Sequence, residues 1–314
     1  MYLRHFHLTR HPFHITPDPE FLYSSPSHRE ALASIIYGIE ERKGFLALVG
    51  VVGVGKTTVL RTFTEKADKE KLKVIYLFNA NMTFKTLVKT LCTELDLPSD
   101  TEDYFELVPK LYEALIEQYR RQRNVVLIID EAQNMPIETL ENLRMLSNLE
   151  TTKDKLIQIV LCGQIELDYM LSLQQLRQLK QRIVLRAVIS PLTPGESEEY
   201  IRHRLARAGC TRAIPFSKAA LKEIVRHAHG IPRIINILCD NALLTTFGYR
   251  KAKVEKNIVM EVIIDRGEKK RLALPRWAIA GLLAMLLAMV AASGIWIGST
   301  KMSGMITLGK YFRF

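Results

Sequence analysis

The chain has 314 residues, of which 48% are hydrophobic and 25% are charged, enough for one large or two modest globular domains. Its four cysteines (Cys92, Cys162, Cys210 and Cys239) stand singly without CxxC spacing, which argues against a disulfide framework or a zinc site. The first ten residues lack the apolar run of a signal peptide. We therefore expect the chain, up to its far C-terminal end, to lie in the reducing cytoplasm.

The net charge of +11 is unevenly distributed. Residues 200–256 contain twelve Lys and Arg against three acidic residues, a net charge of +9, and residues 266–276 add +4. This asymmetry indicates an anionic partner, either nucleic acid or a membrane surface. A solvated basic face without a partner is the alternative.

Short apolar runs separated by helical patterns predict an α/β domain with a mostly parallel sheet. The first run, FLALVG, ends in a glycine and is followed at once by the helical pattern KTTVLRTF. The expected buried strands are residues 45–50, 74–78, 125–130, 156–163 and 183–190.

No further strand is expected after Ile189, and three helices follow. Thr193 and Glu196 form a capping box that begins a helix which Gly209 can end. A second helix is expected from Ser217 to His229, closed by Gly230. A third begins at Pro232 and stops near Gly248. The sequence thus predicts an α/β core with a C-terminal helical bundle.

The segment GVVGVGKTT matches the phosphate-binding pattern G-x-x-x-x-G-K-[ST] between a predicted strand and a predicted helix. Glycines allow backbone N–H groups to close around phosphates, the lysine reaches the β and γ oxygens, and the threonine hydroxyl faces Mg²⁺. We expect ATP and Mg²⁺ as ligands. The expected nucleotide-binding residues are Gly50, Gly53, Val54, Gly55, Lys56, Thr57 and Thr58.

The run VVLIIDEAQ supplies the second half of such a site. An apolar strand delivers Asp130 to its carboxyl end, where together with Thr57 it can hold Mg²⁺. Glu131 follows directly and is placed to polarise a water molecule for attack, which favours an ATPase over a kinase. The alternative is a solvated helix cap.

This order of motifs, followed by a helical lid, resembles an AAA+ ATPase. The resemblance implies that Gln164 is a polar sensor of the γ-phosphate, although a loop amide without a role is also possible. It also implies that Arg233, a cation placed unfavourably at the start of a lid helix, is the sensor-2 arginine.

AAA+ ATPases form rings, and the resemblance therefore implies a homo-oligomer. In such rings an arginine before the last strand reaches the γ-phosphate of the neighbouring subunit and stabilises transferring charge. Arg182 is the expected finger and Arg177 the reserve, and a surface salt bridge would explain either equally well.

Two weaker expectations concern the first 44 residues. His5, His7, His11 and His14 lie in an irregular stretch and are not expected to bind a metal. His28 and Tyr23 are expected near the adenine, because the resemblance places the lead to the first strand there.

Residues 277–298 contain no charge and, at about 1.5 Å per residue, are long enough to cross a hydrocarbon core of about 30 Å. Trp277 and Trp296 stand near the two ends, where interfacial rings belong. Because a basic segment precedes this stretch, the positive-inside rule predicts a single-pass inner-membrane protein with its ATPase domain in the cytoplasm.

The first fifty residues, with IDEAQN, GQIEL, LRQLKQRI and HGIPRIINILCDNALL, resemble the general secretion pathway protein A (ExeA-type) family and its pilus-biogenesis relatives. The resemblance covers about residues 1–265. It implies an inner-membrane ATPase of Gram-negative bacteria that works with a membrane partner protein in secretin assembly. Relatives of exopolysaccharide export are equally compatible. Some members carry a peptidoglycan-binding domain after the span, whereas only sixteen residues follow it here.

Two other functions remain open. DNA-binding ATPases of the transposition or replication-loader type share this core, and a basic lid suits phosphates as well as an anionic inner leaflet. A nucleotide-gated scaffold with little hydrolysis is disfavoured by Asp130 and Glu131. The expected organisation is lead 1–44, α/β core 45–190, lid 191–265, basic segment 266–276, membrane helix 277–298 and periplasmic tail 299–314.

Overall fold

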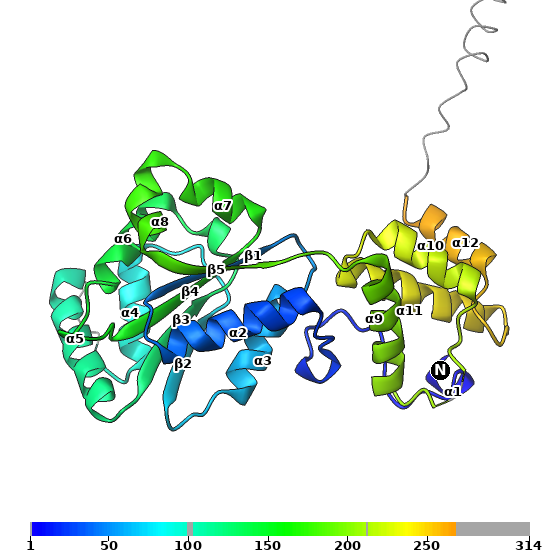
Figure 1. Ribbon diagram of the computed structural model, residues 1–314, viewed down its shortest axis with the longest axis horizontal. Helices are drawn as coiled ribbons and strands as arrows, with labels where there is room; N and C mark the ends of the chain where they lie inside the picture. Colours follow the sequence, from blue (N-terminus) through cyan, green and yellow to red (C-terminus); the bar gives the residue numbers. More distant parts are fainter. Residues whose placement is uncertain (1, 99–102, 212, 268–314) are drawn as a thin grey trace, which may run out of the picture. The chain divides into compact units, whose positions relative to one another are not determined.

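A five-stranded sheet with the order β2-β3-β4-β1-β5 forms the centre of the α/β domain (Figure 1). The computed structural model describes residues 2–98, 103–211 and 213–267. All strand pairs in this sheet are parallel, as the sequence predicts. The strands are β1 (Phe45–Gly50), β2 (Leu72–Leu77), β3 (Asn124–Ile129), β4 (Ile157–Gly163) and β5 (Ile183–Ile189).

Helices cover both faces of the sheet and create two apolar cores. On one face α2 (Pro26–Glu40) and α3 (Lys56–Lys66) pack against β1, β3 and β4. On the other face lie α4 (Phe84–Glu94), α5 (Tyr104–Arg120) and α6 (Ile137–Leu146). Because the three central strands are covered on both sides, every residue of β1, β3 and β4 is buried, which explains their continuous apolar runs.

The strand register brings two predicted motifs to one edge of the sheet. Val49 of β1 pairs with Gly163 of β4, and Ile129 of β3 pairs with Leu161 of the same strand. The loop after β1 and the carboxylates after β3 therefore leave the sheet at its carboxyl edge, where ligands of parallel α/β sheets bind.

The helical lid follows β5. The capping box predicted at Thr193 is present, because its side chain accepts from the Glu196 backbone N–H while the Glu196 carboxylate accepts from the Thr193 N–H. Ser217 caps the second predicted helix, and Pro232 begins the third. The lid helices are α9 (Pro194–Arg207), α10 (Lys218–Ala228), α11 (Pro232–Gly248) and α12 (Lys256–Asp265).

The fourth lid helix, α12, was not predicted. Its first residues follow a run rich in lysine, which resembles a solvated loop in the sequence. In the structure Val254, just before the helix, is anchored: its N–H donates to Pro215 O at 2.8 Å and its carbonyl accepts from Ser217 N at 2.9 Å. This anchoring allows Ile258 and Val259 to be fully buried.

The N-terminal lead is more ordered than the sequence indicates. The short helix α1 (Tyr2–His5) contacts α11, and Phe6 and Leu8 are buried. The Tyr2 hydroxyl donates to Asp240 Oδ1 at 2.5 Å. The described residues up to and including Val262 group into one compact unit. The division of the chain into lead, core and lid at the stated boundaries stays a prediction.

Within the three described ranges, no helix combines the length and the apolarity that a membrane crossing requires. The expected span at 277–298 and the tail at 299–314 lie outside the described residues, as does most of the basic segment 266–276. The four cysteines form no disulfide; Cys92, Cys162 and Cys239 are buried, whereas Cys210 is half-buried.

Candidate functional site

The loop between β1 and α3 is shaped by two glycines in the left-handed region. Gly53 has a φ of 82° and Gly55 a φ of 110°. A Cβ at Gly53 would lie 2.7 Å from the Arg233 Cβ, and one at Gly55 would lie 2.9 Å from the His28 Nε2. Side chains at either position would therefore collide with neighbours and strain the backbone. The predicted phosphate-binding loop has the conformation that its sequence requires.

Lys56 begins α3 and folds back along this loop. Its side chain is only 5% exposed, and its ammonium donates to Gly50 O at 2.9 Å and to Val51 O at 3.2 Å. A lysine held by backbone carbonyls inside a concave loop presents its charge to whatever the loop encloses. An anion such as a phosphate group suits this position.

Asp130 is buried at the end of β3 and is held by several donors. The Thr57 hydroxyl donates to Oδ2 at 2.9 Å, the Tyr76 hydroxyl donates to the same oxygen at 2.8 Å, and the Glu131 N–H donates to Oδ1 at 2.9 Å. Burial, together with the neighbouring Asp130 charge, raises the pKa of Tyr76 far above its ordinary value. The pKa of the Cys162 thiol is raised for the same two reasons, burial being the larger.

Glu131 adopts the left-handed conformation, with a φ of 53°, which is uncommon for a residue with a side chain. Its Oε2 accepts from Gln133 Nε2 at 2.6 Å and from Gln164 Nε2 at 2.8 Å. Gln133 Oε1 in turn accepts from the Gln164 N–H at 3.0 Å. Two amide donors therefore fix one oxygen of the carboxylate, and the carboxylate must be at least partly released before that oxygen can accept a proton.

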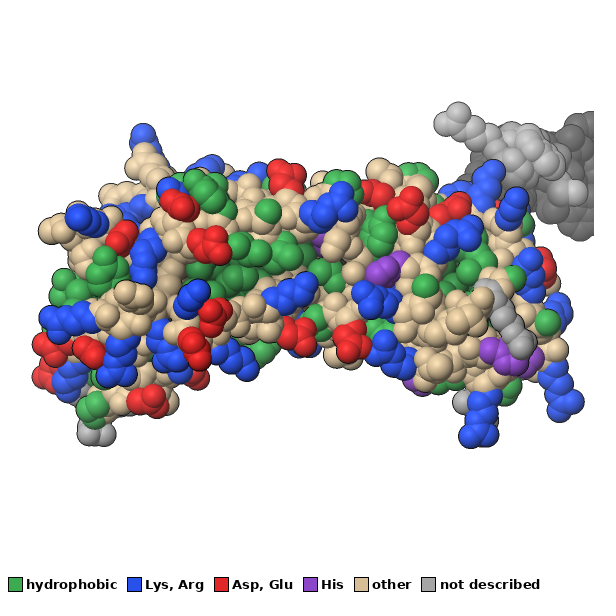
Figure 2. All heavy atoms as spheres, turned by 60° about the horizontal axis from the view of Figure 1, so that its bottom comes forward, with side chains coloured by type: hydrophobic (Ala, Val, Ile, Leu, Met, Phe, Trp, Pro, Cys, Tyr) green, Lys and Arg blue, Asp and Glu red, His purple; other side chains and the backbone are tan. Residues whose placement is uncertain are grey.

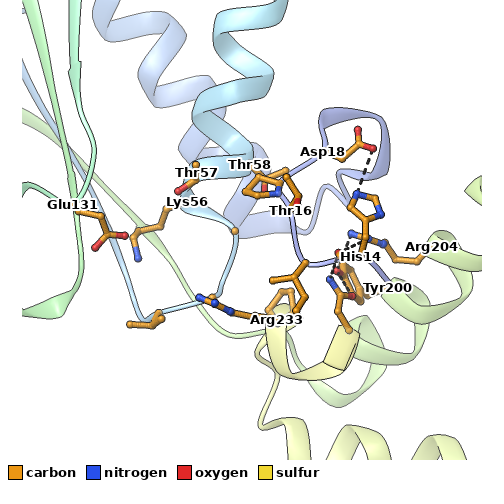
Figure 3. A pocket seen from close by; sticks show the side chains of 17 residues that line it. His14, Thr16, Asp18, Lys56, Thr57, Thr58, Glu131, Tyr200, Arg204 and Arg233 are labelled. Carbon is orange, nitrogen blue, oxygen red and sulfur yellow. Dashed lines mark hydrogen bonds and ion pairs between the residues drawn. The ribbon is translucent and has the colours of Figure 1, made fainter. Parts of the chain in front are cut away.

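A cleft of about 390 Å³ borders the loop, and several of the predicted residues line it, among them Lys56, Glu131 and Arg233. Lys56 and Glu131 lie together at one end of it, and His14, Tyr200 and Arg204 lie toward the other (Figure 3). Its lining residues come from the lead, the α/β core and the lid: His14, Ile15, Thr16, Pro17, Asp18, Val52, Gly53, Gly55, Lys56, Thr57, Thr58, Glu131, Tyr200, Arg204, Pro232, Arg233 and Asn236.

The lid contributes Arg233 to this cleft. Its backbone N–H donates to Gly53 O at 3.2 Å, so the first turn of α11 contacts the phosphate-binding loop directly. Figure 3 shows the Arg233 side chain directed at the loop. A cation at a helix N-terminus is unfavourable unless an anion lies nearby. The phosphate contact of Arg233 stays a prediction.

The opposite end of the cleft is bounded by a segment of the lead, His14 to Asp18, which we did not predict. It is fastened to the lid by Arg204, whose guanidinium donates to Pro12 O at 2.5 Å and His14 O at 3.1 Å. The guanidinium also lies over the Phe21 ring at 4.7 Å. No local pattern in the sequence distinguishes this buried arginine from the exposed basic residues around it.

A smaller cavity of about 40 Å³ adjoins the loop, and both residues expected near the adenine line it, together with Phe21, Leu22 and Leu192. His28 bridges Val54 O at 2.9 Å and the Ser25 hydroxyl at 2.7 Å. Burial lowers the pKa of His28. Tyr23 donates to Glu199 at 2.7 Å, and burial followed by this carboxylate raises the pKa of Tyr23 to about 12.

The predicted residues differ in how closely they approach the cleft. Gly50, Asp130 and Gln164 do not line it but form hydrogen bonds with residues that do. Val54 lies between the lining residues Gly53 and Gly55 and borders the smaller cavity instead. Arg182 is not part of it: it donates to Asn148 Oδ1 at 2.8 Å and to the Ser147 hydroxyl.

Arg182 directly precedes β5, whose first residue pairs with Phe45 at the amino end of β1. It therefore lies at the sheet edge opposite Gly50, and its predicted role requires a second subunit. Arg177, the reserve, is exposed at the start of α8 (Arg177–Arg182).

Comparisons with known proteins agree with this geometry. Residues 39–171 match the family model described as an AAA domain. The chain is 37% identical over 303 residues to general secretion pathway protein A of Aeromonas hydrophila, which covers 94% of the chain and 54% of that protein. The chain thus spans about half the length of this curated relative.

Two solved structures share the fold at low sequence identity. The ORC2 protein of Aeropyrum pernix, an ADPNP–ADP complex, superimposes with a TM-score of 0.59 at 17% identity, covering 81% of this chain and 71% of that one. Cdc6p of Pyrobaculum aerophilum gives a TM-score of 0.59 at 17% identity, covering 78% and 70%. These similarities establish the AAA+ fold, a parallel five-stranded sheet with a C-terminal helical lid.

Proposed function

Because the chain is a homologue of general secretion pathway protein A with an AAA domain and an AAA+ fold, we propose that it binds ATP with Mg²⁺ and hydrolyses it. The observation that carries this proposal is the single cleft lined by Lys56, Glu131 and Arg233, which come from three separate parts of the chain. An AAA domain implies nucleotide binding, and the donors in this cleft suit a triphosphate.

Each part of the cleft has a role in this proposal. The loop N–H groups and Lys56 hold the phosphates, and Arg233 contacts them from the lid. Thr57 and Asp130 supply the oxygen ligands that Mg²⁺ prefers, and the ion would neutralise charge on the phosphate oxygens. The adenine occupies the side of the loop lined by His28 and Tyr23.

Glu131 is the proposed general base, and Gln164 its neighbour and sensor. Its carboxylate shares the cleft with Lys56, and Gln133 and Gln164 set its orientation. We propose that a bound triphosphate draws the Gln164 amide away from Oε2 of the carboxylate, which frees this oxygen to accept a proton from water.

We further propose that this ATPase serves a bacterial envelope export system of the type II secretion, pilus or exopolysaccharide type. In this proposal the chain is anchored by residues 277–298 in the inner membrane, assembles as a homo-oligomeric ring with Arg182 as finger, and works with an inner-membrane partner protein. Similarity to general secretion pathway protein A supports the assignment to secretion.

The basic lid supports contact with an anionic surface. On the part of the lid that Figure 2 shows, Lys and Arg side chains are more frequent than Asp and Glu side chains. Apart from Arg233 in the cleft, the exposed Lys and Arg side chains among the described lid residues are Arg202, Arg207, Lys218, Lys222, Arg226, Arg250, Lys251, Lys253 and Lys256. The anionic inner leaflet is the proposed partner, and DNA is the second candidate, because both present phosphates.

Two substitutions test the hydrolytic site. Lys56→Ala should abolish binding of a fluorescent ATP analogue, because it removes the buried cation. Glu131→Gln should bind the analogue normally and hydrolyse ATP about 10²- to 10⁴-fold more slowly, the usual contribution of a general base. Near-wild-type hydrolysis by Glu131→Gln would reject Glu131 as the base, and unchanged binding by Lys56→Ala would reject the nucleotide site.

A further inference from the structure

Tyr76 lies on the edge strand β2, on the sheet face that α3 covers. Its neighbours on that face, Leu72 and Val74, pack against the apolar core beneath α3. In the strand register Tyr76 pairs with Ile128, so Asp130 lies two residues further along the adjacent strand on the same face. Diagonal neighbours of this kind are within reach of a long aromatic side chain.

The Tyr76 hydroxyl uses this reach to contact Asp130. It donates to Oδ2 at 2.8 Å, and the Thr57 hydroxyl donates to the same oxygen at 2.9 Å. The two donors come from different elements, β2 and α3, while the Glu131 N–H holds Oδ1 at 2.9 Å. The carboxylate is therefore fixed in rotation with Oδ2 turned to the predicted metal ligand Thr57.

The Tyr76 ring is itself held in place. It stacks on Phe78 with ring centroids 4.4 Å apart and an interplanar angle of 30°. The two rings border a groove that also includes Arg61 and Pro19. Phe78 is 66% exposed, so the stack keeps one side of the Tyr76 ring covered at an otherwise open sheet edge.

We propose that Tyr76 is a positioning residue for the Mg²⁺ site: its hydroxyl orients the Asp130 carboxylate, which binds the ion together with Thr57. The proposal rests on the function proposed above. Groups that hydrogen-bond to metal-ligating carboxylates typically change metal affinity by about 10- to 100-fold when removed. The Tyr76 hydroxyl is such a group, and the rest of its side chain is not required for the effect.

Tyr76→Phe removes only the hydroxyl and keeps the ring stack. In the 314-residue chain carrying this substitution, the Mg²⁺ concentration that half-saturates the complex with a fluorescent ADP analogue should rise about tenfold. Affinity for the same analogue in EDTA should stay within twofold of wild type. A role confined to folding would not separate the two measurements in this way.

Tyr119→Phe is the matched control. The Tyr119 hydroxyl also donates to an aspartate, Asp154 Oδ2 at 2.7 Å, but this pair does not line the cleft. The Tyr119→Phe substitution should therefore leave the Mg²⁺ concentration for half-saturation unchanged. A Tyr76→Phe protein that requires no more Mg²⁺ than wild type overturns the proposal, and so does an equal loss of affinity in EDTA. If wild type itself binds no nucleotide, the proposed function fails instead.

Discussion

Replacing Arg204 with methionine should destabilise the protein through a defined set of lost contacts. The guanidinium is 5% exposed and donates to the carbonyls of Pro12 and His14 and to the Tyr200 hydroxyl. Methionine fills most of the same volume but offers no donor. Two carbonyls of the lead would then lose their charged partner inside the protein.

Two opposing effects determine how much Arg204→Met changes the free energy of unfolding. The Pro12 carbonyl would be left unsatisfied inside the protein, which costs about 1–3 kcal/mol, whereas the His14 carbonyl keeps Asn236 Nδ2 as a donor at 3.4 Å and loses about 1 kcal/mol. Loss of the cation over the Phe21 ring adds about 1 kcal/mol. Methionine avoids the cost of burying a guanidinium, which offsets part of this. Because the substitution removes the guanidinium but leaves the backbone carbonyls in place, we expect the free energy of unfolding to decrease by about 3 kcal/mol.

Urea unfolding followed by far-UV circular dichroism measures this change. With an m-value of about 3 kcal/mol/M, the midpoint should fall by about 1 M. Arg207→Met is the control, because Arg207 is an exposed arginine on the same helix, and it should stay within about 0.5 kcal/mol of wild type. An unchanged or higher midpoint for Arg204→Met would show that desolvation of the guanidinium cancels its hydrogen bonds, and would refute the reasoning.

Three further predictions follow from the site and the lid. Burial lowers the folded-state pKa of His28 below its ordinary value of 6.5. The unfolded chain therefore binds more protons than the folded protein, and the free energy of unfolding should decrease as the pH falls below 6.5. His28→Asn should reduce this pH dependence, as measured by thermal unfolding at a series of pH values from 6.5 downward. Arg182→Ala should bind ATP normally yet lose the hydrolysis that depends on subunit assembly, and mixing it with Lys56→Ala protein should restore activity. A finger acting between subunits would be contradicted by an inactive mixture together with a wild-type specific activity that does not depend on protein concentration. A chain ending at residue 265 should bind anionic vesicles, and this binding should weaken as salt is added. Replacing Lys218 and Lys222 with glutamate should reduce the binding free energy by about 1 kcal/mol or more per residue. Salt-sensitive binding to duplex DNA, with no preference for anionic over neutral vesicles, would favour the DNA-binding alternative.

Much of the fold was predictable because the determining signals are local. Continuous apolar runs marked β1, β3 and β4, since strands buried on both faces leave no polar alternation. The capping box at Thr193 and the prolines and glycines around the lid helices determine helix ends only a few residues away. The phosphate-binding loop is also local, because the conformations of Gly53 and Gly55 depend mainly on their own lack of a side chain.

The candidate site was predictable only in part, for the same reason. The sequence by itself determined the loop, the strand that presents Asp130, and the adjacent Glu131. It did not determine which oxygens these carboxylates turn toward, because Gln133 and Gln164 meet at Glu131 only when β3 and β4 lie side by side.

Tertiary structure alone decided the contacts between distant segments. Tyr76 and Asp130 are 54 residues apart and meet through strand pairing, and Arg204 reaches the carbonyl of His14 across 190 residues. Among the basic residues of the lid, nothing in the local spacing distinguishes Arg204, which is buried, from Arg202 and Arg207, which are exposed. Burial depends on what packs against a side chain from elsewhere in the chain, and a hydrogen bond across that distance leaves no periodic trace in the sequence.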